Sequence, residues 1–367
     1  MTRRGFLLGT GAANLALPLA ASPEAASRSA RFTEPSATPP NQGAQRLSLA
    51  RLQAWESLGY GMFLHFGIST FTGHEWDDGK SPASAYDPDR LDVDQWIQVA
   101  RDAGMKYAVL CTKHVAGACL WPSRQTGYTV ANSGRQTDVV EAFVKACERR
   151  GIRPGLYYCS FDNHHSFGSV TVDHCGLPYN TVEQVHYIER NGKAYTTSVF
   201  QDFQAAQISE LLQQCGPIAE MWIDEPGVLA CSYRTFLYRH VSSLQPDCVV
   251  LMNGSYGDLE KWDPWFTWPQ DLIGYEVYLP PPPRHVPWRT IEGKQYYLPA
   301  EVYDLLAHHW FWVEGDKPRA DGELLALYRN ARARGANLLL DVPPDKHGLV
   351  PHEYQQALMR LRCNAGI

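Results

Sequence analysis

The stretch TDVVEAFVKACERRGIRPGLYYCS, residues 137–160, contains a predicted helix followed at once by a predicted strand. Five apolar side chains recur at helical spacing, and Gly151 follows the last of them as a helix-ending residue. These side chains are Val139, Val140, Phe143, Val144 and Cys147. Residues 152–160 then form a nearly continuous apolar run, which is typical of a strand buried on both faces of a parallel sheet. The stretch therefore predicts one repeating unit of an α/β fold.

The same alternation of strand and helix continues through most of the chain. Further strands are predicted at residues 59–67, 106–114, 218–226, 247–255 and 336–344. Further helices are predicted at residues 92–104, 200–216, 232–244, 320–335 and 352–362. This pattern favours a parallel sheet covered by helices, and the number of units suits a (β/α)8-like, TIM-type barrel. An open doubly wound sheet is the alternative. No G-x-G-x-x-G or P-loop motif follows the first strand, so a nucleotide site is not supported.

The amino-acid composition and net charge indicate which class of protein and which partners to expect. The 367 residues are 44% hydrophobic and 20% charged, as in ordinary globular proteins. The net charge of -6 argues against nucleic acid as a partner. The 11 Trp and 19 Tyr suit a pocket that stacks on sugar rings, because these side chains combine an apolar face with a polar tip.

The N-terminal residues predict export. Paired arginines, Arg3 and Arg4, precede a short apolar run and then small residues, so residues 1–27 are predicted to be a twin-arginine-type signal peptide. The apolar run is too short to span a membrane comfortably, and no membrane contact is expected after signal removal. Residues 28–47 are predicted to be a linker and residues 48–367 the catalytic barrel domain. We therefore expect a periplasmic or secreted protein.

The 9 cysteines are scattered and odd in number. No CxxC pair occurs, so a zinc ribbon is not expected. An oxidising compartment would permit disulfides, but the spacing does not pair the cysteines.

Polar or aromatic side chains stand at the end of each predicted strand. In a (β/α)8 barrel the carboxyl ends of the strands form the active-site rim, so these side chains are expected to converge. They are His65, Lys113, His114, Tyr157, Tyr158, Ser160, Asp224, Glu225, Asn253 and Asp341.

Two kinds of chemistry fit such a rim. His65, His114 and Asp224 could bind a metal ion, but the tight H-x-H of barrel metallohydrolases is missing, so no metal or other cofactor is expected. The alternative is glycoside hydrolysis, in which two carboxyl groups act across one bond. Asp224 suits the first carboxyl. Its neighbour Glu225 points to the opposite face of a regular strand, so the second must come from elsewhere.

The order of several segments resembles the α-L-fucosidases of glycoside hydrolase family 29, over about Leu49 to Leu349. These segments are GMFLHFG, HEWDD, ARDAGMKYAVLCTKH, TDVVEAFVKACERRGIRPGLYY, ELLQQCGPIAEMWIDE and RARGANLLLDVPPDKHG. The resemblance implies a (β/α)8-like barrel and an exo-acting enzyme that releases terminal α-L-fucose from an oligosaccharide or glycoconjugate with retention of configuration. It makes Asp224 the nucleophile, which forms a covalent glycosyl-enzyme.

The resemblance also implies the other site residues. The sugar-binding positions would be His65, Glu75, Trp76, His114 and either Tyr157 or Tyr158. The segment 296–312 resembles a family segment that carries the acid/base, which points to Glu301. Glu276 and Glu260 are its competitors.

The chain departs from the family pattern after the second strand. KHVAGA places Val115 and Ala116 where the family has His and Asp, so one sugar hydroxyl loses a partner or another substituent gains room. An α-glycosidase with a different sugar specificity and an inactive carbohydrate-binding barrel therefore remain alternatives. Loops 161–198 and 279–288 are expected to shape outer subsites. The family's C-terminal β-sandwich is expected to be absent, and the sequence leaves the oligomeric state open.

Overall fold

The computed structural model describes residues 41–165, 198–253, 267–277 and 286–367. The chain divides into two compact units, residues 1–40 and 41–367, and all described residues belong to the second. The predicted signal peptide, residues 28–40 of the predicted linker, Glu260 and most of the two predicted subsite loops lie outside the described residues.

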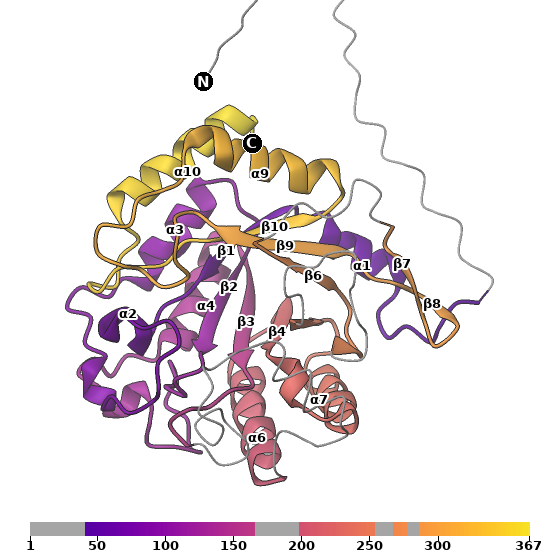
Figure 1. Cartoon of the computed structure of the whole chain (residues 1–367), viewed down its shortest axis with the longest axis horizontal. Coiled ribbons are helices and arrows are strands. Elements are labelled where there is room, and N and C mark those ends of the chain that lie inside the picture. The colour runs from indigo at the N-terminus through magenta and orange to yellow at the C-terminus, as the bar shows by residue number, and fades with distance from the viewer. Residues whose placement is uncertain (1–40, 166–197, 254–266, 278–285) are drawn as a thin grey trace, which may run out of the picture. The chain divides into compact units, whose positions relative to one another are not determined.

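Eight strands of the described chain form one parallel sheet in the order β5-β4-β3-β2-β1-β10-β9-β6, which confirms the (β/α)8-like barrel (Figure 1). The strands are β1 Tyr60–Leu64, β2 Tyr107–Lys113, β3 Arg153–Cys159, β4 Glu220–Asp224, β5 Val249–Asn253, β6 Ile273–Glu276, β9 Ala300–Leu305 and β10 Asn337–Asp341. β7 Trp288–Ile291 and β8 Lys294–Tyr297 form a separate antiparallel hairpin. Because all eight strands are parallel, their carboxyl ends meet at one rim.

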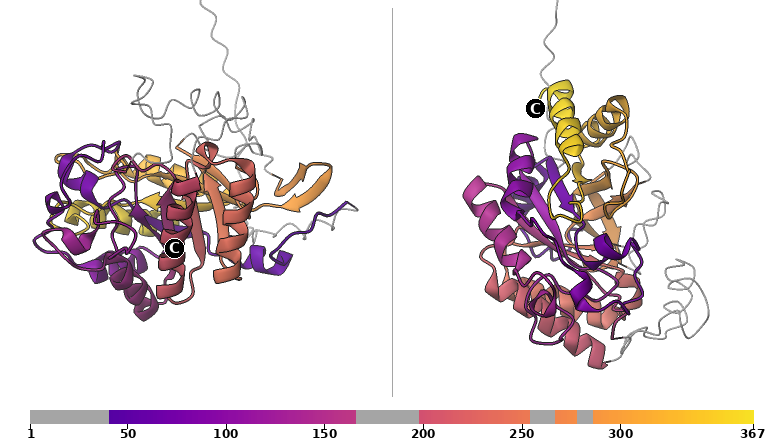
Figure 2. Two further views of the ribbon diagram at one scale, coloured as in Figure 1. Left: turned by 90° about the horizontal axis from the view of Figure 1, so that it is seen from below. Right: turned by 90° about the vertical axis from the view of Figure 1, so that its left-hand side faces the viewer.

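Helices lie outside the strands in both views of Figure 2. Consecutive helices contact each other in the pairs α3 with α4, α6 with α7, and α9 with α10. The helices are α1 Leu49–Glu56, α2 Ile68–Thr72, α3 Val93–Asp102, α4 Val139–Arg150, α6 Ser198–Gln214, α7 Cys231–Leu244, α9 Asp321–Ala333 and α10 His352–Ala365. Short 3-10 turns are η1 Ala83–Ala85, η2 Val130–Asn132 and η4 Pro226–Val228. No helix among the described residues has the length and apolar character needed to cross a membrane.

The helix predicted at 137–151 shows how the sequence specifies these elements. The Asp138 carboxylate accepts a hydrogen bond from the Glu141 backbone N–H at 2.8 Å and so caps the helix start. Gly151 has a φ of 67° and ends the helix in the left-handed conformation that glycine adopts at no steric cost. Val140 and Phe143 lie on its buried face, as predicted.

The barrel interior is filled by large side chains in layers. Phe63, Tyr157 and Tyr303 surround the Trp222 ring, with centroid distances of 5.2, 5.4 and 4.8 Å. Gly274 makes room for them, since a Cβ there would lie 2.6 Å from the Tyr303 hydroxyl oxygen. The layer of rings forms the floor beneath the strand ends.

Backbone and side-chain hydrogen bonds of Gln270 and Asp271, just before β6, join β5 to the start of β6, the two end strands of the sheet. The Asp271 N–H donates to the Val250 carbonyl at 2.8 Å, and the Asp271 carboxylate accepts from the Val250 N–H at 2.9 Å. Higher up, the Met252 N–H donates to Gln270 Oε1 at 3.0 Å. These bonds continue the ladder across this position, which we call the β5–β6 seam.

The end of the predicted linker packs on the barrel domain. The Gly43 N–H donates to the Gln295 carbonyl of the β7–β8 hairpin at 2.8 Å. Arg46 binds the carbonyl oxygens of Pro246 and Cys248, each at 2.6 Å, and forms an ion pair with Asp271. Fixed contacts therefore begin several residues before the predicted boundary at residue 48.

Candidate active site

Asp224 ends β4 at the barrel rim, where it is 8% exposed. Its two carboxylate oxygens have separate donors. The Tyr157 hydroxyl donates to Oδ2 at 2.5 Å, and Asn253 Nδ2 donates to Oδ1 at 2.7 Å. Burial raises the pKa of Asp224, while these bonds lower it and favour the ionised form. The carboxylate is therefore held in one orientation.

Glu276 ends β6 and shares the amide of Asn253. Asn253 Nδ2 donates to Glu276 Oε2 at 3.3 Å in addition to its bond with Asp224. Two oxygens bonded to one nitrogen at these distances lie at most about 6 Å apart. Burial and the charge of Asp224 raise the pKa of Glu276 to about 8, against a weaker effect of the Asn253 bond. The structure thus places side by side a buried carboxylate with two short hydrogen bonds and a carboxyl group whose environment favours its protonated form.

Glu75 and Trp76 follow β1 and lie at the same rim. Burial, with the charges of Asp341 and Asp224, raises the pKa of Glu75 to about 7, and His309 opposes the rise. The Trp76 ring lies 5.8 Å from the His114 ring. Both predicted residues therefore lie in the group of side chains around the strand ends.

His65 and His114 face each other, with ring centroids 5.8 Å apart. His65 Nδ1 lies 2.8 Å from Asp341 Oδ1, at the end of β10. Burial lowers the pKa of His65 to about 3 and lowers that of His114 well below its usual value, so both rings are neutral. A neutral imidazole has one donor and one acceptor nitrogen, which suits a sugar hydroxyl.

The two tyrosines of β3 point to opposite sides of the sheet. Tyr157 reaches Asp224 and stacks on His114 with centroids 5.8 Å apart. The Tyr158 hydroxyl donates to Gln207 of α6 at 2.6 Å, in the helix layer. The structure therefore brings Tyr157 into the site and leaves Tyr158 outside it, as the period of two in a strand requires.

Glu301 is not at the rim. It stands second in β9, opposite Gly274 and Asn337, and is fully buried. The Tyr107 hydroxyl donates to its Oε1 at 2.7 Å, and Trp222 Nε1 donates to its Oε2 at 3.0 Å. It therefore lies beneath the Trp222 ring, on the other side of that ring layer from Asp224.

This position corrects the assignment of Glu301 as the acid/base. The carboxyl is separated from the rim by the layer of aromatic rings, so it cannot act together with Asp224 across one bond. Of its two competitors, Glu276 lies beside Asp224, and Glu260 is outside the described residues.

Several site residues were not assigned a role from the sequence. Trp310 and Phe311, in the loop after β9, pack on His65 with centroids 5.1 and 5.3 Å from it. Asn253 and Asp341 were recognised only as strand ends. Their roles follow from which neighbours they meet across the barrel, and no local sequence pattern carries that information.

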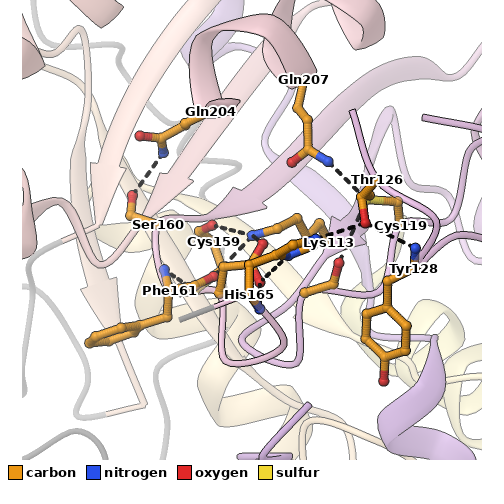
Figure 3. A network of polar contacts seen from close by, with 12 residues as sticks. Lys113, Cys119, Thr126, Tyr128, Cys159, Ser160, Phe161, His165, Gln204 and Gln207 are labelled. Carbon is orange, nitrogen blue, oxygen red and sulfur yellow. Dashed lines mark hydrogen bonds and ion pairs between the residues drawn. The ribbon is translucent and has the colours of Figure 1, made fainter. Parts of the chain in front are cut away.

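A buried network outside the barrel holds the ends of β2 and β3. Lys113 Nζ donates to the carbonyl oxygens of Cys159 and Phe161, at 3.2 and 2.9 Å, and pairs with Asp162 at 3.3 Å. Figure 3 shows Lys113 among side chains from β3, the loop that follows it and α6. Asp162 also binds His165, which contacts Thr126 at 2.8 Å. The network fixes the strand ends from which His114 and Tyr157 enter the site.

Val115 and Ala116 are both buried, at 1% and 2% exposure. Val115 packs in the main core, and Ala116 packs with Ile68 and Tyr128. Neither side chain can hydrogen-bond, so the departure from the family pattern leaves apolar packing and no hydrogen-bonding side chain at these two positions. Among the described residues, no cluster of three or more His, Cys, Asp and Glu side chains has a metal-binding arrangement.

A parallel barrel with two carboxyl groups that share one amide donor at its strand ends has the architecture of a barrel glycoside hydrolase. Comparison with known proteins agrees with this class. The α-L-fucosidase family model matches residues 78–362, and the chain belongs to that family.

Individual relatives give the extent of the similarity. Alpha-L-fucosidase 1 of Arabidopsis thaliana is 30% identical over 321 residues, which cover 82% of this chain and 56% of the plant protein. The chain thus spans about half the length of the plant relatives it matches. The solved alpha-L-fucosidase isoenzyme 1 of Paenibacillus thiaminolyticus is 25% identical, with a TM-score of 0.68 over 85% of this chain and 74% of that one. An alpha-L-fucosidase of Lactobacillus casei, solved with α-L-fucose product, shares the fold at 21% identity, with a TM-score of 0.66 over 86% of this chain and 98% of that one.

Proposed function

We propose that the protein is a retaining exo-α-L-fucosidase, with Asp224 as nucleophile and Glu276 as acid/base. Asp224 Oδ attacks the anomeric carbon while the bond to the leaving oxygen breaks, and Glu276 gives its proton to that oxygen. A water molecule then gives a proton to Glu276, and its oxygen displaces Asp224 from the anomeric carbon. Two inversions give net retention.

The shared Asn253 amide is the observation that carries this proposal. It holds the two carboxyl groups close to the about 5–5.5 Å separation of retaining glycosidases and nearer than the about 6.5–9.5 Å of inverting ones. The two environments also separate the roles. Asp224 has two short hydrogen bonds that favour its anion, whereas Glu276 has one long bond and a pKa raised to about 8.

The surrounding side chains suit a neutral deoxysugar. His65, His114 and Glu75 offer hydrogen-bonding groups to ring hydroxyls, and Trp76, Trp310 and Phe311 offer apolar surface to a methyl group. These six side chains come from the rims of β1, β2 and β9.

A different sugar specificity is the second candidate, and the lack of a hydrogen-bonding side chain at Val115 and Ala116 favours it. A sugar with an apolar substituent, or none, at this point would lose less binding free energy there than fucose. A panel of aryl glycosides compares the two candidates. Faster cleavage of another α-glycoside than of the α-L-fucoside would support the second.

The test of the proposed function compares the wild type with Asp224→Ala on an aryl α-L-fucoside. The variant should lose at least about 10³-fold in kcat, because no covalent intermediate can form. Proton NMR of the wild-type reaction should show the α anomer of fucose first. A first-formed β anomer would contradict retention, and an active Asp224→Ala variant would contradict the assigned nucleophile.

We also propose twin-arginine export to the periplasm or medium, on the basis of the Arg3–Arg4 pair and the apolar run after it. Fractionation of cells that express the full chain tests this. Replacement of both arginines by lysine should retain the protein in the cytoplasm, and unchanged export would refute the proposal.

A further inference from the structure

The orientation of the Asn253 amide is set by a residue outside the pair of carboxyl groups. The Tyr303 hydroxyl on β9 donates to Asn253 Oδ1. A side-chain amide carries its acceptor on one side and its two donors on the other. With the oxygen bound by Tyr303, the NH2 group faces Asp224 at 2.7 Å and Glu276 at 3.3 Å. The reverse orientation would place a carbonyl oxygen against two carboxyl groups.

The Tyr303 hydroxyl has a fixed position. Gly274 of β6 leaves the space for it, since a Cβ would lie 2.6 Å from the hydroxyl oxygen. The Tyr303 ring packs edge-on against Trp222 at 4.8 Å and 80°. Trp222 is in turn held by its bond to Glu301 at 3.0 Å. The Tyr303 side chain is fully buried, so its hydroxyl group does not contact solvent.

We propose that Tyr303 is a positioning residue for the reaction, which fixes the Asn253 amide so that its donors face both the nucleophile and the acid/base. This inference rests on the proposed function of Asp224 and Glu276. During glycosylation the negative charge leaves Asp224, as its oxygen bonds to the sugar, and appears on Glu276, as that group gives up its proton. The NH2 group of Asn253 contacts both carboxyl groups. It therefore stabilises the charge on Asp224 before glycosylation and the charge on Glu276 after it, without a change of orientation.

Loss of the hydroxyl has a consequence for titration as well as for rate. Without the Tyr303 hydroxyl, the amide loses the contact that orients its oxygen, and its bonds to both carboxyl groups, which favour their ionised forms, are weakened. Other titratable groups around the two carboxyl groups are unchanged by this loss. They are His65, Glu75, Cys111, Tyr157, Cys159, Glu225 and Asp341.

The experiment compares the pH dependence of kcat/KM on an aryl α-L-fucoside for the wild type, Tyr303→Phe and Asn253→Ala. Tyr303→Phe should lower kcat/KM about tenfold, the effect of one buried hydrogen bond, and should move both the acid and the basic limb to higher pH. The matched control is Tyr233→Phe on α7, which removes a hydroxyl that donates to the Gln201 carbonyl of α6 at 2.6 Å and should leave kcat/KM and both limbs unchanged. Tyr303→Phe should have no further effect in an Asn253→Ala background.

Two results would overturn the inference. One is a lower kcat/KM in Tyr303→Phe with both limbs of the pH profile in their wild-type positions. This result would show that the hydroxyl contributes to packing only. The other is additive losses in the double variant.

Thermal unfolding gives a readout that needs no turnover, so the inference can be tested even if the wild type cleaves no fucoside and the proposed function fails. The raised pKa of Glu276 makes its stabilising contribution complete at low pH and lost as pH rises through about 8. Tm should fall as the pH rises and Glu276 loses its proton. Because the pKa of Glu276 should be higher in Tyr303→Phe and Asn253→Ala, this fall should end at a higher pH in these two variants than in Tyr233→Phe. Identical pH ranges in all three would contradict the inference.

Discussion

Glu225, the residue after the proposed nucleophile, has a φ of 53°. This left-handed conformation is uncommon for a residue with a side chain and costs on the order of 1–3 kcal/mol. It ends β4 directly after Asp224 and starts the η4 turn at Pro226. The cost is consistent with a backbone whose course is set by the orientation of Asp224.

Glu276 should set the basic limb of the pH–rate profile. A general acid must carry its proton, so kcat/KM should be retained below the pKa of about 8 and fall above it. In Glu276→Gln the rate should be low and this limb absent. The profile measured on an aryl α-L-fucoside checks this, and a wild-type basic limb that survives in Glu276→Gln would assign it to another group.

Leaving-group ability gives an independent check on the same residue. Glu276→Ala should lose about 10²-fold or more in kcat/KM on a fucoside with a poor leaving group, which needs protonation. It should lose far less on an activated aryl fucoside. Equal losses on both substrates would count against a role as acid.

At the scale of elements, the seam between β5 and β6 depends on Asp271. Its carboxylate accepts from Arg46, from Tyr238 at 2.6 Å and from the Val250 N–H at 2.9 Å. Asp271→Ala would leave a largely buried guanidinium and a backbone N–H without this partner. We expect a loss of about 3 kcal/mol in the free energy of unfolding, measured by urea denaturation at pH 7.

The control for this variant is Asp247→Ala, an exposed residue near the same edge whose backbone carbonyl accepts from Arg51. Its free energy of unfolding should be within about 0.5 kcal/mol of the wild-type value. A loss in Asp271→Ala no larger than in the control would show that the seam does not rely on this carboxylate.

The sequence predicted six of the eight barrel strands, and the two that it missed explain the error at Glu301. β6 and β9 contain Glu276, Glu301 and Asp304, and so lack the apolar runs that identify buried strands. The register places Glu276 opposite Tyr303 and Glu301 opposite Gly274, one inward-facing layer lower. Resemblance between segments carries no information about this height in the barrel, which separates a rim carboxyl from a floor carboxyl.

At the scale of the whole molecule, the parallel barrel was predictable because repeated α/β units admit few other folds. The arrangement of side chains at the rim was predictable only in part. His65, Glu75, Trp76, His114, Tyr157 and Asp224 converge as expected. The bonds that Tyr157 and Asn253 donate to Asp224 depend on the register between β3, β4 and β5, which the sequence does not show.

The cysteines allow a test of how the molecule is stabilised. Eight of the nine lie among the described residues, and all eight are free thiols. Five of them, such as Cys111 and Cys159, are buried in the core. A reducing agent should leave Tm unchanged, and thiol titration in denaturant should find at least eight thiols. Fewer thiols, or a lower Tm on reduction, would indicate a disulfide that contributes to stability.

Azide rescue of Glu276→Ala and Glu301→Ala, measured side by side on an activated aryl α-L-fucoside, separates the two assignments of the acid/base. Azide needs no general base, so it should accelerate turnover of Glu276→Ala and give α-L-fucosyl azide, the product of attack on a covalent intermediate. Glu301→Ala should show no rescue, because its carboxyl lies below the ring layer. Rescue of Glu301→Ala, with none for Glu276→Ala, would contradict the assignment of Glu276 as acid/base.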